Sequence, residues 1–227
     1  MSHLSDWIPV DGSNSLVHRT SFIYPGVEIG DDTIVEEFAI LGKPHRSQRT
    51  DLDRLLQDGT QLYLNKTVIG LRCYIQAGSV IYQGVSLADD VICTDYVMVG
   101  PGSTIGTRSK LQYRAQIFHN VQIGPDCRIG GFCCNGSRIG KGSTVYGTLV
   151  HHYRQHGGDP SDLAPTVGND VVVAFNSTVV GDIRIGDNSY IASGALVTKD
   201  VPPDSIVIGV DSVVHRSRWS GRLSSHV

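Results

Sequence analysis

Aliphatic side chains recur at every sixth position over most of this chain. Three runs keep this spacing, over residues 17–41, 69–129 and 167–197, with a cysteine, Cys93, at one of the positions. A small or β-branched residue follows most of these positions by four. An exposed strand would alternate with period two and an amphipathic helix with period 3.6, so neither explains the pattern. Period six with glycine-containing turns is typical of a β-solenoid, in which each hexad forms a short strand and a turn.

These hexads, with their I-G-D and I-G-P turns, resemble the hexapeptide-repeat family. In that family three hexads make one coil of a left-handed parallel β-helix of triangular section. The resemblance covers almost everything from 17 to 201, and it predicts an all-β fold of this kind. We expect an N-terminal segment at 1–16, the β-helix domain at 17–208 and a C-terminal tail at 209–227.

Two excursions are expected to leave the solenoid. Residues 43–66 contain one short helical pattern, between Thr50 as a cap and Gly59 as a stop. Residues 151–166 lose the period and are rich in His, Gly, Asp and Pro, so we predict a projecting loop. Because regular coils present only a smooth face, an interrupted solenoid is typically building a site on the interrupting loops.

The repeat also contains a smaller irregularity in phase. Ile129 and Ile139 are ten residues apart where twelve would keep the period. We assign this compression to the turn N-G-S-R at 135–138. The coil that follows would then be shorter at that turn than its neighbours.

The register also predicts which cysteines face the core and which face outward. None forms a C-x-x-C pair or a zinc-finger spacing. Three of them, Cys73, Cys127 and Cys133, fall on the small inward position, and Cys93 falls on the aliphatic one, where a free cysteine packs as a small apolar residue. Cys134 is predicted to face outward, which makes it the one thiol expected to be accessible.

Composition narrows the class of protein. With 26 glycines and 7% aromatic residues, the core must be a stack of small aliphatic side chains. The net charge of −3 is spread over both signs, so we expect no nucleic-acid partner. No apolar run reaches the roughly 18 residues of a membrane span, and the N-terminus lacks a leader pattern, so a soluble cytoplasmic protein without membrane contact is expected. From the length we also expect no nucleotidyltransferase domain before the solenoid.

His119 is not required by the repeat. It lies two residues after Ile117, so the register places it at a turn with its side chain outward, which an ordinary surface histidine would also satisfy. The string H-N-V-Q-I-G resembles the H-[DN]-x-x-I-G segment of hexapeptide acyltransferases, including sugar N-acetyltransferases and lipid A N-acyltransferases, in which the histidine is the general base. Imidazole suits that role, because it can accept at neutral pH the proton of an amine or alcohol attacking a thioester.

We also consider two residues that could assist His119. Asn120 either positions the imidazole or is an ordinary turn asparagine. One coil further on, the backbone N–H of Gly136 is a candidate donor to the oxyanion of the tetrahedral intermediate.

The acyl donor is predicted from the segment I-A-S-G-A-L-V-T-K-D-V-P-P at 191–203, which resembles the acetyl-CoA-binding coils of the family. There the pantetheine arm lies in a groove between the β-helices of adjacent subunits. The resemblance therefore implies acetyl-CoA as acyl donor and a homotrimer, with Ala174, Ala192 and Lys199 as cofactor-binding residues. Alternatively, the two alanines are present only because the turns require small residues, and they do not bind a cofactor.

The chain departs from the family after Gly209. Members commonly continue with G-[NV]-P-A-[KR], whereas here V-D-S follows. The basic residue that meets the coenzyme phosphate is then missing from its usual place, and a donor other than acetyl-CoA stays open. Arg216, Arg218 or Arg222 could replace that residue.

The acceptor is suggested by the segment I-L-G-K-P-H-R at 40–46, which resembles acyltransferases of polysaccharide gene clusters. This favours a small-molecule acceptor, an amino sugar or nucleotide-linked sugar acetylated at an amine or hydroxyl. An amino acid or antibiotic acceptor stays open. His151, His152 and Tyr153 of the second excursion are predicted to contact the acceptor, with Asp159 beside them.

Two other functions compete with acyl transfer. A zinc carbonic anhydrase of the solenoid type needs three histidines, for which His119, His151 and His156 are candidates. However, two of these lie in the aperiodic loop, and no H-G-x-x-I-G string follows, so no metal site is predicted. A non-enzymatic scaffold explains the repeat but leaves the H-N-V-Q-I-G string without a purpose.

Overall fold

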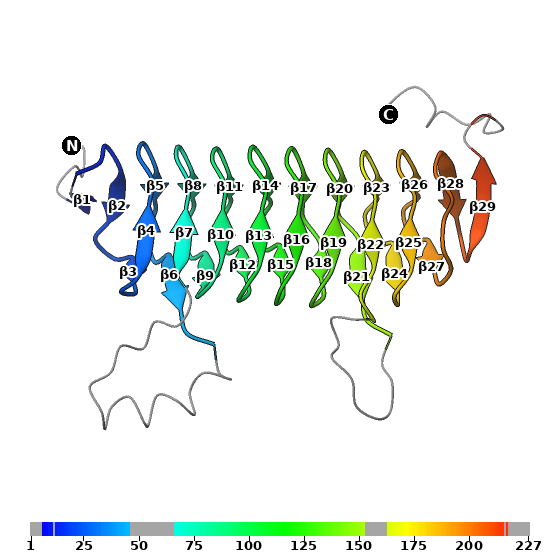
Figure 1. Cartoon of the computed structure of the whole chain (residues 1–227), viewed down its shortest axis with the longest axis horizontal. Helices are drawn as coiled ribbons and strands as arrows, with labels where there is room; N and C mark the ends of the chain where they lie inside the picture. Colours follow the sequence, from blue (N-terminus) through cyan, green and yellow to red (C-terminus); the bar gives the residue numbers. More distant parts are fainter. Residues whose placement is uncertain (1–5, 11, 46–65, 153–162, 216, 218–227) are drawn as a thin grey trace.

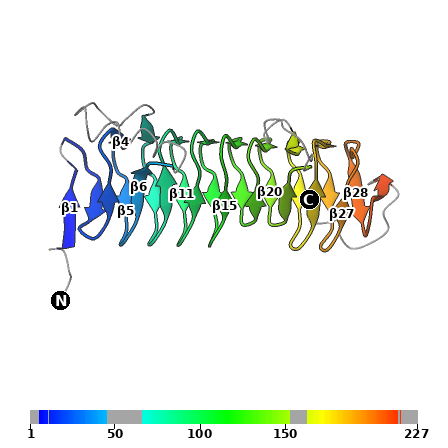
Figure 2. The same cartoon turned by 90° about the horizontal axis from the view of Figure 1, so that it is seen from below.

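The computed structural model describes residues 6–10, 12–45, 66–152, 163–215 and 217, and within them it is a stack of parallel β-coils around one axis (Figure 1). The chain passes through three sheets in turn, here called A, B and C, so that one circuit makes one coil. This confirms the predicted all-β, left-handed parallel β-helix. Seen from below, the coils follow each other along the same axis (Figure 2). Among the described residues, no helix has the length and apolar character needed to span a membrane.

Nearly all strands pair in parallel with the strand of the same sheet in the next coil. In sheet order, sheet A contains β1 (Trp7–Pro9), β2 (Leu16–His18), β5 (Ile34–Val35), β8 (Tyr74–Ile75), β11 (Ile92–Cys93), β14 (Lys110–Leu111), β17 (Arg128–Ile129), β20 (Thr144–Val145), β23 (Val172–Val173), β26 (Tyr190–Ile191), β28 (Ser205–Ile208) and β29 (Ser212–His215). Sheet B contains β3 (Phe22–Ile23), β6 (Ile40–Lys43), β9 (Val80–Tyr82), β12 (Met98–Val99), β15 (Gln116–Ile117), β18 (Phe132–Cys133), β21 (Thr148–Val150), β24 (Thr178–Val180) and β27 (Leu196–Val197). Sheet C contains β4 (Val27–Ile29), β7 (Thr67–Ile69), β10 (Ser86–Leu87), β13 (Thr104–Ile105), β16 (Gln122–Ile123), β19 (Arg138–Ile139), β22 (Thr166–Val167) and β25 (Arg184–Ile185).

The two ends of sheet A are closed by antiparallel strands. β1 pairs antiparallel with β2 at one end, and β28 pairs antiparallel with β29 at the other (Figure 1). An open sheet edge would offer unpaired backbone groups to another chain, so these strands protect the ends of the solenoid.

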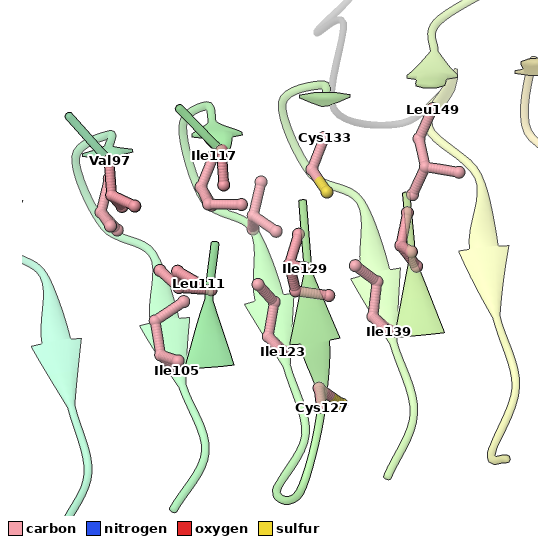
Figure 3. Close-up of a cluster of buried hydrophobic side chains, with 14 of the residues drawn as sticks. Val97, Ile105, Leu111, Ile117, Ile123, Cys127, Ile129, Cys133, Ile139 and Leu149 are labelled. Carbon is pink, nitrogen blue, oxygen red and sulfur yellow. The ribbon is translucent and has the colours of Figure 1, made fainter. Parts of the chain in front are cut away.

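The core is the stack of aliphatic side chains that the period predicted. Ile105, Ile117 and Ile129 are at most 2% exposed, and equivalent side chains of successive coils point into the interior together (Figure 3). The small inward position is often serine. The Ser103 hydroxyl donates to the Phe118 carbonyl at 2.7 Å and accepts from the Val121 amide at 3.1 Å, so a buried hydroxyl is satisfied by backbone of neighbouring coils.

The compression lies at a different turn from the one predicted. Cys133 pairs with Ile117 and Ile139 pairs with Ile123, so the segment 135–138 keeps the period. Two residues are instead missing from the corner between β17 and β18, which consists only of Gly130 and Gly131. A Cβ on Gly131 would come within 1.9 Å of the carbonyl oxygen of Gly147, which forms the equally short corner in the next coil.

This shift corrects two cysteine assignments. Cys133 occupies the aliphatic position between Ile117 and Leu149, not the small inward position (Figure 3). Cys134 is 1% exposed, so the prediction that it faces outward was wrong. Its Sγ lies 3.3 Å from the inward hydroxyl of Ser137, and burial raises the pKa of the thiol.

Candidate functional site

The corner at which the chain passes from sheet B to sheet C, here called the B/C corner, is where both excursions begin. The first leaves after β6 and returns at β7, and the second leaves after β21 and returns at β22. Sheet B strands lie along one side of the solenoid (Figure 1), so the excursions depart from the same edge. The helical pattern at 50–59 lies outside the described residues, as do Tyr153, His156 and Asp159.

His119 lies on this B/C corner, two positions after the buried Ile117 of β15, and it is half-buried. The equivalent positions of the next two coils are Asn135 and His151. The Asn135 side-chain oxygen accepts a hydrogen bond from the His119 backbone amide at 3.1 Å. His151 is buried, and its Nε2 donates to the Asn135 carbonyl at 3.0 Å. Three successive coils therefore hold the backbone that carries the His119 imidazole.

A second histidine contacts His119 from the first excursion. The rings of His45 and His119 are edge-on, with centroids 4.2 Å apart and planes at 80°. His45 is also edge-on to Tyr82 of β9, with centroids 6.0 Å apart, and the Lys43 ammonium lies 5.5 Å from the centre of the Tyr82 ring. Sequence reasoning missed this cluster of Lys43, His45, Tyr82 and His119, although the segment I-L-G-K-P-H-R supplies two of the four.

The surroundings of His119 favour its neutral form. Burial lowers the pKa of the imidazole below its ordinary value near 6.5, and the adjacent His45 lowers it further. Desolvation and a second potential cation both penalise the imidazolium. At neutral pH His119 is therefore a free base that can accept a proton.

The predicted helpers of His119 have structural roles in this chain. The Gly136 amide donates to the His119 carbonyl at 2.8 Å, so that N–H is engaged within the solenoid. Asn120 has a left-handed φ of 54°, and its backbone N–H donates to the Pro101 carbonyl at 2.9 Å. Asparagine tolerates this conformation better than most residues, which accounts for its presence at the turn.

The predicted acceptor and donor residues lie at different places. His151 and the exposed His152 are on the B/C corner with His119, and Lys199 is exposed at the same corner four coils further along sheet B. Ala174 and Ala192 lie instead at the corner between sheets A and B, in adjacent coils. Within one chain, the two alanines are therefore not on the same corner as His119. The arginines at 216, 218 and 222 lie outside the described residues.

A shallow hollow of about 460 Å³ opens on the outer face of sheet C, on strands that follow the B/C corner. Its lining comes from β16, β19 and β22 and the residues after them: Gln122, Ile123, Gly124, Arg138, Ile139, Gly140, Thr166, Val167, Gly168 and Asn169. No group of three or more His, Cys, Asp or Glu side chains that could hold a metal ion occurs among the described residues.

Comparison with known proteins agrees with the repeat. Residues 164–199 match the family model described as bacterial transferase hexapeptide (six repeats). The match covers one part of the solenoid and shows hexapeptide repeats of this kind there. This chain is 27% identical over 208 residues to the bifunctional protein GlmU of Listeria welshimeri, a match that covers 91% of this chain and 43% of that protein. The chain thus spans less than half the length of the curated relatives it matches.

Two solved structures are also similar. The UDP-N-acetylglucosamine acyltransferase from Campylobacter jejuni is 17% identical with a TM-score of 0.48, and the match covers 89% of this chain and 78% of that one. A mutant of the perosamine N-acetyltransferase from Caulobacter crescentus was solved in complex with CoA and GDP-perosamine. It is 14% identical with a TM-score of 0.25, and the match covers 86% of this chain and 53% of that one.

Proposed function

We propose that this protein is an acyltransferase that moves an acetyl group from acetyl-CoA to an amine or hydroxyl of a small acceptor, with His119 as the general base. The observation that carries the proposal is the His119 imidazole, which lies at the B/C corner from which both excursions depart and whose pKa is lowered. The match of residues 164–199 to a transferase repeat supports the reaction class.

In the proposed reaction, His119 removes the proton from the acceptor as its nitrogen or oxygen bonds to the thioester carbonyl carbon. The C–S bond then breaks, and the departing coenzyme thiolate takes a proton, for which the His119 imidazolium is the source. A general base of this kind contributes about 10² to 10⁴ in rate. The backbone of His119 is held on both sides, by Asn135 and Gly136, which fixes the turn from which the imidazole projects.

Three residues are proposed to bind the donor. Ala174 and Ala192 stack in adjacent coils, and a methyl side chain leaves the neighbouring main chain open to a narrow pantetheine arm. Lys199, exposed on the same corner as His119, can meet a coenzyme phosphate. Because the alanines and His119 lie on different corners, a groove that uses both needs two copies of the chain, which supports the proposed homotrimer.

An amino sugar or nucleotide-linked sugar is the proposed acceptor class. Support comes from the resemblance of the segment 40–46 to acyltransferases of polysaccharide gene clusters, and the structure puts part of that segment against His119. His151, His152 and Tyr153 are proposed to contact the acceptor from the second excursion.

A panel of acceptors tests the proposal. Amino sugars, their nucleotide-linked forms, amino acids and aminoglycosides are each mixed with acetyl-CoA, and free thiol is followed with a chromogenic disulfide. The protein's own five cysteines are buried and give little background. Acceptor-dependent thiol release with a sugar amine or hydroxyl is expected. Absence of release with every acceptor, together with no measurable coenzyme binding, would reject acyl transfer.

A further inference from the structure

The first excursion starts with a cation, Lys43, which is connected to His119 through the rings of Tyr82 and His45. We propose that Lys43, Tyr82 and His45 form a subsite that binds an anionic group of the acceptor, a phosphate or a carboxylate, next to the proton-accepting imidazole. The inference rests on the proposed function of His119 and extends it, because it names the charge that the acceptor carries.

A β-bulge creates this arrangement. In β6 the register with β9 shifts between Leu41 and Lys43, so that Lys43 comes opposite Tyr82. Gly42, at the shift, has a left-handed φ of 76°, and a Cβ there would come within 2.5 Å of the Val27 side chain. Glycine is therefore required at this position. Bulges commonly redirect a strand beside a functional site.

After the bulge the chain leaves the coil, and His45 contacts His119 of a later coil. The Lys43 carbonyl accepts from the Gln83 amide at 3.0 Å, which holds the end of β6 against the residue that follows β9. His119 follows β15, three sheet B strands beyond β6, or about 14 Å at the usual strand spacing. Two residues of extended chain reach about 7 Å, so the His45 and His119 side chains can span the rest. The observed ring contact of His45 with His119 agrees with this path.

The charges at the cluster suit an anion. The Lys43 ammonium lies over the Tyr82 ring, and in the part of the chain that the structure describes no carboxylate forms an ion pair with it. Lysine is a common phosphate ligand, and two neighbouring imidazoles add hydrogen-bonding groups. The cluster thus has positive charge and donors on one side of His119.

The position along the axis assigns this subsite to the acceptor. Lys43 and Tyr82 lie in coils on the N-terminal side of His119, whereas Ala174, Ala192 and Lys199 lie in coils on its C-terminal side. The proposed acceptor contacts His151 and His152 lie between His119 and the coils of Ala192 and Lys199, so an acceptor that extends from Lys43 past His119 would meet a donor bound further towards the C-terminus. An anionic group held by Lys43 therefore belongs to the molecule that loses the proton.

Steady-state kinetics of Lys43→Ala test the subsite in the full-length protein. Matched acceptors are an amino sugar that carries a phosphate, the same sugar without it, and an amino acid that carries a carboxylate. We expect KM for the phosphorylated or the carboxylated acceptor to rise at least about 10-fold, with kcat, KM for acetyl-CoA and the neutral acceptor unchanged. Lys43→Arg should restore most of the affinity, and Lys110→Ala, on the outer face of sheet A, is the control.

A binding measurement keeps the two proposals separable. The imidazole NMR signals of His45 and His119 are followed while pyrophosphate or acetate is added, which requires no acetyl transfer. We expect one of the two anions to shift both signals in the wild type and not in Lys43→Ala. Anion binding without turnover would support the subsite and count against the acyltransferase. Equal shifts in both proteins, or an equal loss of activity of Lys43→Ala on charged and neutral acceptors, would overturn the subsite.

Discussion

The His45 ring meets the His119 ring edge-on, with centroids 4.2 Å apart. One ring comes from the start of the first excursion and the other from a turn of the solenoid. The contact removes water from one side of His119 and puts a second titratable group beside it. Both effects oppose protonation of His119, and they have a measurable consequence for pH dependence.

We expect kcat/KM to rise with pH along an acid limb whose midpoint lies below 6.5. The neutral imidazole is the active form, so a lowered pKa extends activity to lower pH. Replacing His45 by alanine exposes His119 and removes the neighbouring charge, and both changes raise its pKa. The limb of His45→Ala should therefore move up towards 6.5, as measured by pH profiles of the initial rate.

A distant histidine controls for this measurement. His215 is exposed in β29, at the end of sheet A, and His215→Ala should leave the limb where it is in the wild type. An acid limb that is the same in His45→Ala and the wild type would show that the ring contact does not tune His119.

Replacing His119 itself should lower turnover by about 10² to 10⁴, the usual contribution of a general base. The His119→Ala variant should keep the wild-type circular dichroism and oligomeric state, because the side chain is outside the aliphatic stack. Turnover is measured as thiol release from acetyl-CoA at saturating acceptor. Unchanged turnover would remove His119 from the mechanism, whatever the effect of the other variants.

The sequence predicted the fold well because each hexad contributes one buried aliphatic position, such as Ile105 or Ile117, and this period can be read directly. It could not locate the shortened corner. A ten-residue spacing from Ile129 to Ile139 can be closed at either of two turns, and the period alone does not choose between them. The consecutive glycines Gly130 and Gly131 were the available signal, since a Cβ at Gly131 would come within 1.9 Å of the Gly147 carbonyl oxygen.

The site was predicted less completely. His119 stood out because it departs from the repeat and lies in a recognisable string. His45 and Lys43 were not predicted as its neighbours, because they belong to an excursion where the period gives no register. Their path depends on the bulge at Gly42, and a bulge changes the pairing of a strand without changing its hydrophobic pattern.

The corrected register predicts that no cysteine reacts in the folded protein. All five are buried, and burial raises the pKa of the Cys134 thiol and raises that of Cys73 to about 11. Because the thiolate is the reactive form, native protein should react with an aromatic disulfide reagent only as it unfolds, whereas denatured protein should give five thiols. A single fast thiol in the native protein, mapped by mass spectrometry to Cys134, would contradict the burial found here.

Glycine at the two-residue corners, Gly131 and Gly147, should be necessary for the stability of the solenoid. A Cβ at Gly131 would lie 1.9 Å from the Gly147 carbonyl oxygen, and backbone of the next coil cannot move aside without breaking the strand pairs on either side. We expect Gly131→Ala to lower the free energy of unfolding by about 3 kcal/mol, the upper end of typical overpacking costs. For a chain of this size that corresponds to a fall in Tm of about 10 °C.

Gly194→Ala is the matched control for Gly131→Ala. Gly194 has a φ of 73°, but a Cβ there would meet nothing within 4 Å, so the variant bears only the left-handed penalty of about 1 kcal/mol. Thermal unfolding followed by circular dichroism should therefore rank Gly131→Ala clearly below Gly194→Ala, and both below the wild type. If the two variants melted together, the close approach of the stacked corners would not be what requires glycine at position 131.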